Sequence, residues 1–207
     1  MHTIYLIRHG ETTVFKKGLI AGATDVPLSR TGVQQMQAVA DFLADKPISA
    51  IYSSPLRRAA EPAAELALAR HIPHSEIMDF SEIDFGEWEG KSWEELARLE
   101  PQAFARAKSG SPLFTFPEGE NVEYFRRRVQ IAFAHVVRLT PGPAVIYAHG
   151  GTLRMILAAI QGLTVPQAQS LEISPGSISI LEPGKHSHEL KQMNIISHLN
   201  SNITSGT

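Results

Sequence analysis

Two apolar stretches in this sequence end abruptly in a histidine followed by glycine. Residues 3–7 read TIYLI and run directly into RHG, and residues 143–148 read PAVIYA and run directly into HGG. Short apolar runs rich in β-branched and aromatic residues are typical of buried strands, and a glycine lets the backbone turn away afterwards. The pattern predicts two strands of an α/β sheet that carry His9 and His149 at their carboxyl ends, where ligands bind in such sheets.

A helical pattern follows the second histidine. Residues 152–160 read TLRMILAAI, so a helix is predicted to open after Gly151. The N–H groups and the positive dipole end at the start of a helix attract anions. If the two predicted strands are neighbours in the sheet, both imidazoles and these N–H groups converge. The sequence therefore indicates an anion site at this edge of the sheet.

A third strand is predicted to deliver an arginine to the same edge. Residues 49–52 read SAIY, and SSPLRR follows. Proline suits the first turn of a helix, so a helix is predicted to begin near Pro55, which brings Arg58 within about one turn of the strand end. A guanidinium there can bind a phosphate through two parallel hydrogen bonds. The neighbouring Arg57 is interpreted as a surface charge.

Four sequence blocks resemble the signatures of the histidine phosphatase superfamily, the phosphoglycerate-mutase-like proteins, in the family's order. They are RHGET at 8–12, SSPLRRA at 53–59, EIDFGEWEG at 82–90 and AHGG at 148–151. Within the superfamily the chain resembles the α-ribazole phosphatases most, because three further blocks have similar spacing there. These blocks are GLIAG at 18–22, PLSRTG at 27–32 and PEGE at 117–120.

The resemblance implies a three-layer α/β/α fold of the phosphoglycerate-mutase-like type, with a mostly parallel central sheet. One domain is expected over residues 1–196, with a helical cap inserted at about 79–120, a region rich in tryptophan and proline. Two edge strands are predicted at 177–181 and 189–194 from their alternation. The polar tail, residues 197–207, is expected to be disordered.

Local patterns predict the helices around this site. Helical periodicity and capping residues predict helices over 31–45, 92–108 and 121–139. The last of these carries three consecutive arginines, 126–128, on a face that is expected to be solvated. Pro62 is expected to make the helix after the third strand irregular.

Hydrolysis of a phosphate monoester needs an in-line nucleophile, donors for the phosphoryl oxygens and a proton for the leaving oxygen. The resemblance assigns the nucleophile to His9, which would form a phosphohistidine that water then cleaves. A neutral imidazole is a competent nucleophile near neutral pH. The other ring nitrogen of His9 is expected to donate to a backbone carbonyl. Glu82 is assigned as general acid and then general base, so it must carry a proton when the leaving group departs. Asp84, Glu87 and Glu89 are nearby alternatives, and the family's spacing favours Glu82.

The remaining site residues are expected to hold the phosphoryl group. Arg8, Arg58 and His149 would bind its oxygens together with the N–H groups after Gly150, and a protonated His149 would add a third positive charge. Gly22 and Thr24 are further expected substrate-binding residues.

Two positions depart from the family pattern. Phe15 stands where relatives often have asparagine, and Ala21 stands where they have a small hydroxyl residue. Each departure removes a phosphate hydrogen bond, which predicts weaker phosphate binding or a more apolar substrate.

The composition of the chain limits the chemistry and the binding partners that can be expected. The chain has no cysteine, which excludes disulfides and thiolate chemistry, and its 19 basic and 21 acidic residues include no basic stretch suited to nucleic acid. No stretch approaches the apolar length of a membrane helix, so the cytoplasm is the expected compartment. No cofactor and no metal are expected. The expected partner is a small phosphomonoester, and a homodimer stays open.

The resulting hypothesis is a metal-independent phosphomonoester hydrolase. The substrate that the resemblance suggests is α-ribazole 5'-phosphate, whose hydrolysis is a step in cobalamin biosynthesis. The alternatives are mutase-type phosphoryl transfer, a broad sugar-phosphate phosphatase and a phosphate-binding scaffold without turnover. A metal site at His186 and His188 has plausible ligand spacing but lies in a predicted exposed turn. A serine hydrolase lacks support because the chain contains no GxSxG motif.

Overall fold

A six-stranded sheet forms the centre of the protein in the computed structural model, which describes residues 1–200. The strand order is β3-β2-β4-β1-β5-β6. The strands are β1 (Ile4–Arg8), β2 (Ala50–Ser53), β3 (His74–Glu76), β4 (Ala144–Ala148), β5 (Ile178–Pro183) and β6 (His188–Ile195). The first four are parallel, whereas β5 runs antiparallel to β1 and β6 antiparallel to β5. The predicted mostly parallel sheet is confirmed.

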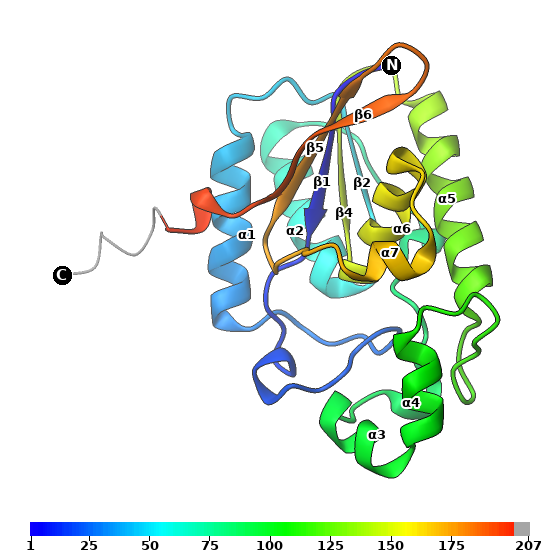
Figure 1. The fold of residues 1–207 in the computed structure, drawn as a ribbon. Helices are drawn as coiled ribbons and strands as arrows, with labels where there is room; N and C mark the ends of the chain where they lie inside the picture. The colour runs from blue at the N-terminus through cyan, green and yellow to red at the C-terminus, as the bar shows by residue number, and fades with distance from the viewer. Residues whose placement is uncertain (201–207) are drawn as a thin grey trace.

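Helices cover both faces of this sheet (Figure 1). They are α1 (Arg30–Leu43), α2 (Arg57–Arg70), α5 (Val122–Leu139), α6 (Gly150–Gln161) and α7 (Val165–Gln169). Alternate residues of β1 face opposite layers, as the period of two in a strand requires. Tyr5 and Ile7 pack with α1 and α2, and Ile4 and Leu6 pack with α5 and α6. Because both faces are covered, the strand is apolar throughout.

The cap lies beyond the carboxyl ends of the parallel strands, at the bottom of Figure 1. It contains the short 3₁₀ turns η2 (Met78–Phe80) and η3 (Gly86–Trp88), and the helices α3 (Trp93–Leu99) and α4 (Pro101–Lys108). Trp88 is fully buried and makes edge-to-face contact with Phe116, which contacts Phe114 in the same way. These three aromatic rings form the core of the cap, and this core is continuous with the α5–α6 side of the sheet.

The observed helices differ from the predicted ones at three places, one at a helix start and two inside a predicted helix. Ser29, not Thr31, caps α1, because its hydroxyl accepts a hydrogen bond from the N–H of Gly32. The predicted helix over 92–108 is two helices that meet at Glu100, because the residue before a proline is disfavoured in helical conformation. Pro62 lies inside α2, which nevertheless runs continuously from Arg57 to Arg70.

Two expectations for the C-terminal region are corrected. β5 is not an edge strand, because it pairs with β1 on one side and with β6 on the other; only β6 lies at the edge. The expected disordered tail begins with an ordered turn, η4 (Ser197–Asn200). His198 in this turn is buried, and its Nε2 lies 3.0 Å from the carbonyl of Gly176. Residues 201–207 lie outside the described residues.

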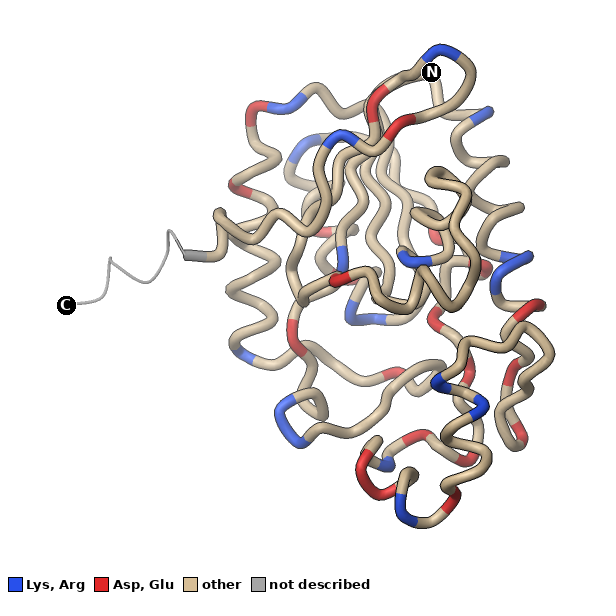
Figure 2. The backbone as a smooth tube through the Cα atoms, viewed as in Figure 1, with Lys and Arg blue, Asp and Glu red and all other residues tan. Residues whose placement is uncertain are grey.

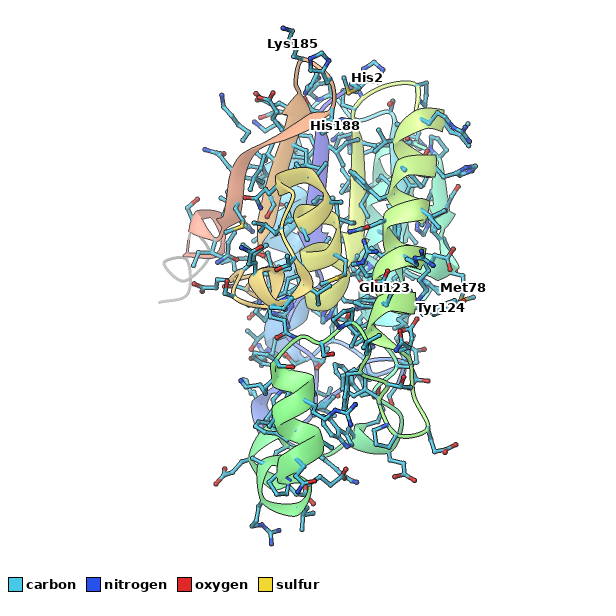
Figure 3. All side chains as sticks on the ribbon, turned by 45° about the vertical axis from the view of Figure 1, so that its right-hand side comes forward. His2, Met78, Glu123, Tyr124, Lys185 and His188 are labelled. Carbon is cyan, nitrogen blue, oxygen red and sulfur yellow. The ribbon has the colours of Figure 1, made fainter. Side chains whose placement is uncertain are left out.

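Charged positions are interspersed along the helices, the loops and the outer strands (Figure 2), whereas β1, β2 and β4 contain only one Lys, Arg, Asp or Glu, Arg8 at the end of β1. At the end of the sheet away from the cap, His188 lies near His2 and Lys185 (Figure 3). The buried His188 donates through Nε2 to the carbonyl of His2 at 2.8 Å, so it has a structural partner. Within residues 1–200, no three or more His, Cys, Asp or Glu side chains are grouped as a metal site, and no helix is long and apolar enough to cross a bilayer.

Candidate active site

The two strand-end histidines lie side by side at the carboxyl end of the sheet. β1 pairs with β4 in parallel, with Arg8 opposite Ala148. His9 and His149 are the next residues, so they leave the two neighbouring strands at the same level. The ring centroids of His9 and His149 are 5.0 Å apart, in an edge-to-face arrangement. The backbone N–H of His9 donates to the carbonyl of Ala148 at 3.0 Å, which fixes the two strand ends together. The predicted convergence of the imidazoles is confirmed.

The buried imidazole of His9 is held in one tautomer. Its Nδ1 lies 2.7 Å from the carbonyl of Gly10, and because a carbonyl only accepts, Nδ1 carries the proton and Nε2 carries the lone pair. Burial lowers the pKa of His9 well below its usual value, and the charges of Arg58 and Arg8 lower it further. The ring is therefore neutral at pH 7, with its lone pair on Nε2. The expected donation to a backbone carbonyl is confirmed.

His149 is a neutral hydrogen-bond donor. Its side chain is fully buried, and its Nδ1 accepts a hydrogen bond from Nε of Arg58 at 3.2 Å, so Nε2 carries the ring proton. Burial lowers the pKa of His149 well below its usual value, and the nearby cations Arg58 and Arg8 lower it further. The structure therefore disfavours the third positive charge considered from the sequence. Nε2 is buried and has no hydrogen-bond partner within residues 1–200.

Two arginines are anchored by backbone carbonyls beside these rings. Arg8 donates through Nη1 to the carbonyl of Ile173, while its buried Nε has no partner among the described residues. Burial lowers the pKa of Arg8 to about 10, so Arg8 keeps its charge at neutral pH. Arg58 is only 1% exposed and donates to the carbonyls of Thr24 and Gly22. Gly22 and Thr24 thus position Arg58, and they do not line the cavity described below.

The side chain of Glu82 lies at the N-terminus of α6. Its carboxylate accepts hydrogen bonds from the backbone N–H groups of Gly151, at 2.8 Å, and Thr152, at 3.2 Å. These are two of the N–H groups that the sequence assigned to phosphoryl oxygens, so in this structure the anion at the helix start is Glu82 itself. A Cβ atom at Gly151 would lie 2.4 Å from Oε1 of Glu82, so a side chain there would displace this carboxylate.

These side chains line a cavity of about 410 Å³ between the sheet and the cap. Arg8, His9, Arg58, Glu82 and Gly150 form its polar side, while His149 lies behind them, buried against His9 and Arg58. Much of the remaining cavity lining is apolar. Its apolar members are Phe15, Leu19, Ile20, Ala21, Ile83, Phe85 and Trp93.

The cavity also contains a cation that the sequence analysis missed. Arg154, in the second turn of α6, lines the cavity and donates through Nε to the carbonyl of Leu171 at 2.9 Å. Burial lowers the pKa of Arg154, and the charge of Glu82 opposes this shift. Its place four residues after Gly150 in the predicted helix is a signal that could have found it, because residues at that spacing share a helix face.

Glu89 organises the loop that holds Arg58, and this role too was missed. Its carboxylate accepts hydrogen bonds from the backbone N–H groups of Gly22, Ala23 and Phe85, at 2.9 to 3.2 Å. The loop carbonyls that hold Arg58 belong to the same segment. No local pattern indicates such contacts, because they join residues far apart in the sequence.

Arg128 corrects the expectation of a solvated arginine face on α5. Arg126 and Arg127 pair with Glu123 near the surface, as expected. Arg128 instead has a side chain only 13% exposed, and it binds Glu120 and the segment that carries Glu82.

A buried neutral imidazole with a free lone pair, surrounded by fixed arginines at the carboxyl end of a parallel sheet, is the arrangement expected of an α/β phosphoryl-transfer enzyme. The chain belongs to the histidine phosphatase superfamily (branch 1), whose family model matches residues 4–196.

Curated relatives and a solved structure agree with this family. The chain is 31% identical over 204 residues to the uncharacterized phosphatase PhoE of Bacillus subtilis, covering 98% of this chain and 100% of that protein. It is also 31% identical to the metal-independent phosphoserine phosphatase of Arabidopsis thaliana, covering 96% and 83% of the two chains. Identity to the adenosylcobalamin/alpha-ribazole phosphatase of Salmonella typhimurium is 26%, covering 80% and 81%.

The structure of YhfR from Bacillus stearothermophilus superposes with a TM-score of 0.88 at 28% identity, covering 96% of this chain and 100% of that one. Together with the names of the curated relatives, this likeness supports phosphatase activity. The relatives have differently named substrates, so they do not single out one substrate for this chain.

Proposed function

We propose that this protein hydrolyses small phosphate monoesters through a phosphohistidine at His9 and needs no metal ion. The observation that carries the proposal is a pair of buried donors beside the nucleophile. Nε of Arg8 and Nε2 of His149 have no partner within residues 1–200, although buried polar groups are nearly always paired. Phosphoryl oxygens would satisfy both donors while Nε2 of His9 faces the phosphorus.

The reaction has two balanced steps. In the first, Nε2 of His9 attacks phosphorus, the ester P–O bond breaks, and the leaving oxygen takes a proton from the carboxyl group of Glu82. In the second, water attacks the phosphorus, the P–N bond breaks, and the Glu82 carboxylate takes a proton from the water. The products are an alcohol and orthophosphate. Arg8 and Arg58 neutralise charge on the phosphoryl oxygens, and His149 donates to one of them.

Glu82 is suited to both steps by its place at the cavity wall. Its carboxylate accepts from the N–H groups at the start of α6, and its charge lies close enough to act on Arg8, Arg58 and Arg154. Glu82 therefore lies among the cations that would bind the phosphoryl group, where it could exchange a proton with the leaving oxygen and then with water.

The apolar wall favours a substrate whose alcohol portion is apolar or aromatic. Phe15, Phe85 and Trp93 line the same cavity as the polar groups, with the Phe15 ring against the guanidinium of Arg8, and the side chain of Ala21 offers no hydrogen bond. α-Ribazole 5'-phosphate, which carries an aromatic base, fits this wall and is the substrate that we propose first. Arg154 favours a second candidate, a phosphate ester that also bears a carboxylate, such as phosphoserine.

A panel of phosphate esters assayed in EDTA tests the proposal. The panel contains α-ribazole 5'-phosphate, phosphoserine, a sugar phosphate and 3-phosphoglycerate, with wild type and His9→Ala compared. We expect orthophosphate release by wild type and its loss in the variant. Interconversion of phosphoglycerates without net release would favour the mutase alternative, and phosphate binding without turnover of any ester would favour the scaffold.

A further inference from the structure

Arg128 makes five hydrogen bonds, and all of them go to the cap: three to backbone carbonyls of residues 79–82 and two to the side chain of Glu120. Its Nε and Nη2 donate to the Glu120 carboxylate at 2.6 and 2.8 Å. Its Nη1 donates to the carbonyls of Asp79 and Ser81 at 2.9 and 3.0 Å, and its Nη2 donates to the carbonyl of Glu82 at 3.2 Å. One guanidinium therefore binds three carbonyls of the segment that ends at the proposed general acid.

Glu120 extends this contact to the other side of Glu82. Its Oε2 accepts a hydrogen bond from the backbone N–H of Asp84 at 3.3 Å, and its own N–H donates to the carbonyl of Asp84 at 2.9 Å. The side chains of Arg128 and Glu120 are only 13% and 10% exposed. The backbone is thus held on both sides of Glu82.

This pair lies outside the catalytic cavity. It lines a second groove at the first turns of α5, together with Met78 and Tyr124, which Figure 3 shows close together there; Glu82 lines both this groove and the catalytic cavity. The carboxylate of Glu82 lines the catalytic cavity and binds the start of α6, whereas its carbonyl binds Arg128. The hydrogen bonds of the pair reach the reaction site through the backbone that carries Glu82, and the charge of Arg128 also acts on the buried His149.

We propose that Arg128, together with Glu120, is a positioning residue that holds Glu82 in place for proton transfer; this inference rests on the proposed function. A general acid must lie within hydrogen-bond reach of the leaving oxygen, and a displacement of about 1 Å at such a site can cost about 100-fold in rate. The clamp formed by Arg128 and Glu120 matters most for substrates whose leaving group needs the proton.

A purely structural ion pair is the competing interpretation, and α5 supplies a matched control. Arg126 binds Glu123 with the same two-pronged geometry, at 2.8 and 2.6 Å, and its remaining hydrogen bond goes to Gln130 within the helix. Arg126 makes no hydrogen bond to the cap segment among the described residues. Loss of this pair should therefore leave proton transfer unchanged.

The experiment compares two substrates that share an aromatic ring and differ in leaving group. p-Nitrophenolate is weakly basic and departs without a proton, whereas the alkoxide released from benzyl phosphate needs one. Values of kcat/KM are measured for both esters in wild type, Glu82→Gln, Arg128→Lys, Glu120→Gln and Arg126→Gln. Lysine keeps the positive charge beside Glu120 and the buried histidines but loses the planar fork that binds three carbonyls.

We expect Arg128→Lys to lower kcat/KM for benzyl phosphate about 10-fold more than for p-nitrophenyl phosphate, a part of the roughly 100-fold or larger effect of general acid catalysis. Glu120→Gln should shift the ratio in the same direction, and Glu82→Gln should shift it furthest. Arg126→Gln should match wild type. Glu120→Gln also keeps the test decisive if Arg128→Lys does not fold.

Equal losses for both esters in Arg128→Lys and Glu120→Gln, or no loss in either, would overturn the positioning role while leaving the proposed function intact. Failure of the proposed function would be seen in a different variant, His9→Ala, in which Arg128 and Glu120 are unchanged. Turnover of p-nitrophenyl phosphate that survives His9→Ala would overturn the proposed function and this inference with it.

Discussion

Acidification should destabilise this protein through its two neutral buried histidines. Burial and neighbouring arginines lower the pKa of both His9 and His149 well below the usual value. Below about pH 6.5 the unfolded chain binds protons at these positions and the native state does not. Stability is therefore fully present above pH 6.5 and falls as the pH falls below it, until the native imidazoles also titrate.

The magnitude follows from proton linkage. One unit below its unfolded pKa, a histidine that stays neutral in the native state contributes about 1.4 kcal/mol less stability. Two such residues contribute about 2.7 kcal/mol to the loss between pH 7.5 and 5.5, a large share of a typical stability of about 5–15 kcal/mol. Carboxylates and partly buried histidines add their own terms, so a variant is needed to isolate this contribution.

Urea unfolding of wild type and His149→Gln at both pH values provides the measurement. The variant removes one titrating ring, so its stability difference between pH 7.5 and 5.5 should be about 1.4 kcal/mol smaller than that of wild type. His186→Gln is the control, because the exposed His186 is solvated in both states. The reasoning is refuted if His149→Gln keeps the full pH difference, or if His186→Gln reduces it equally.

Three further substitutions test the walls of the cavity. Gly151→Ala places a Cβ 2.4 Å from the flexible carboxylate of Glu82, so kcat/KM for benzyl phosphate should fall at least about 10-fold, and an unchanged value would contradict the placement. Phe15→Ala should raise KM for aryl phosphates about 10-fold through lost apolar contact, whereas equal weakening of orthophosphate inhibition would argue against a wall specific to the alcohol portion. Glu89→Gln should lower the urea unfolding free energy by about 2 kcal/mol and weaken orthophosphate inhibition by releasing the loop that holds Arg58; unchanged inhibition would separate this loop from the site.

The two histidines could be predicted from sequence because their signal is local. His149 follows an apolar run directly and His9 follows one after Arg8, so both are placed at strand ends without knowledge of the fold. Their adjacency could only be stated as a condition, since the pairing of β1 with β4 joins segments about 140 residues apart. The sheet order that brings them together is a property of the whole chain.

The partners of the other site residues are long-range and had no local signal. Glu82 and Gly151 are 69 residues apart, so the capture of the helix start by a carboxylate could not be predicted from either segment. Arg58 was expected to grip a phosphate, but three of its donors bind Gly22, Thr24 and His149. Sequence patterns identify the charged groups, whereas packing decides which donors stay free.

Arg128 shows how helical periodicity can mislead. Periodicity distinguishes the face of α5 that packs on the sheet from the opposite face, and it assigned all three arginines to solvent. The cap segment wraps around the first turns of α5 and covers Arg128 alone among them. The break between α3 and α4, by contrast, had a signal in the sequence, because Pro101 disfavours helical conformation at Glu100.

The most direct test of the account is the identity of the atom that carries phosphorus during turnover. Wild type mixed with p-nitrophenyl phosphate in EDTA is quenched rapidly in base, and the peptide that contains His9 is examined by mass spectrometry. The account predicts one phosphoryl group on His9, formed and lost at rates compatible with turnover and absent from His9→Ala. Turnover without this adduct, phosphorylation at another residue, or loss of activity in EDTA would contradict it.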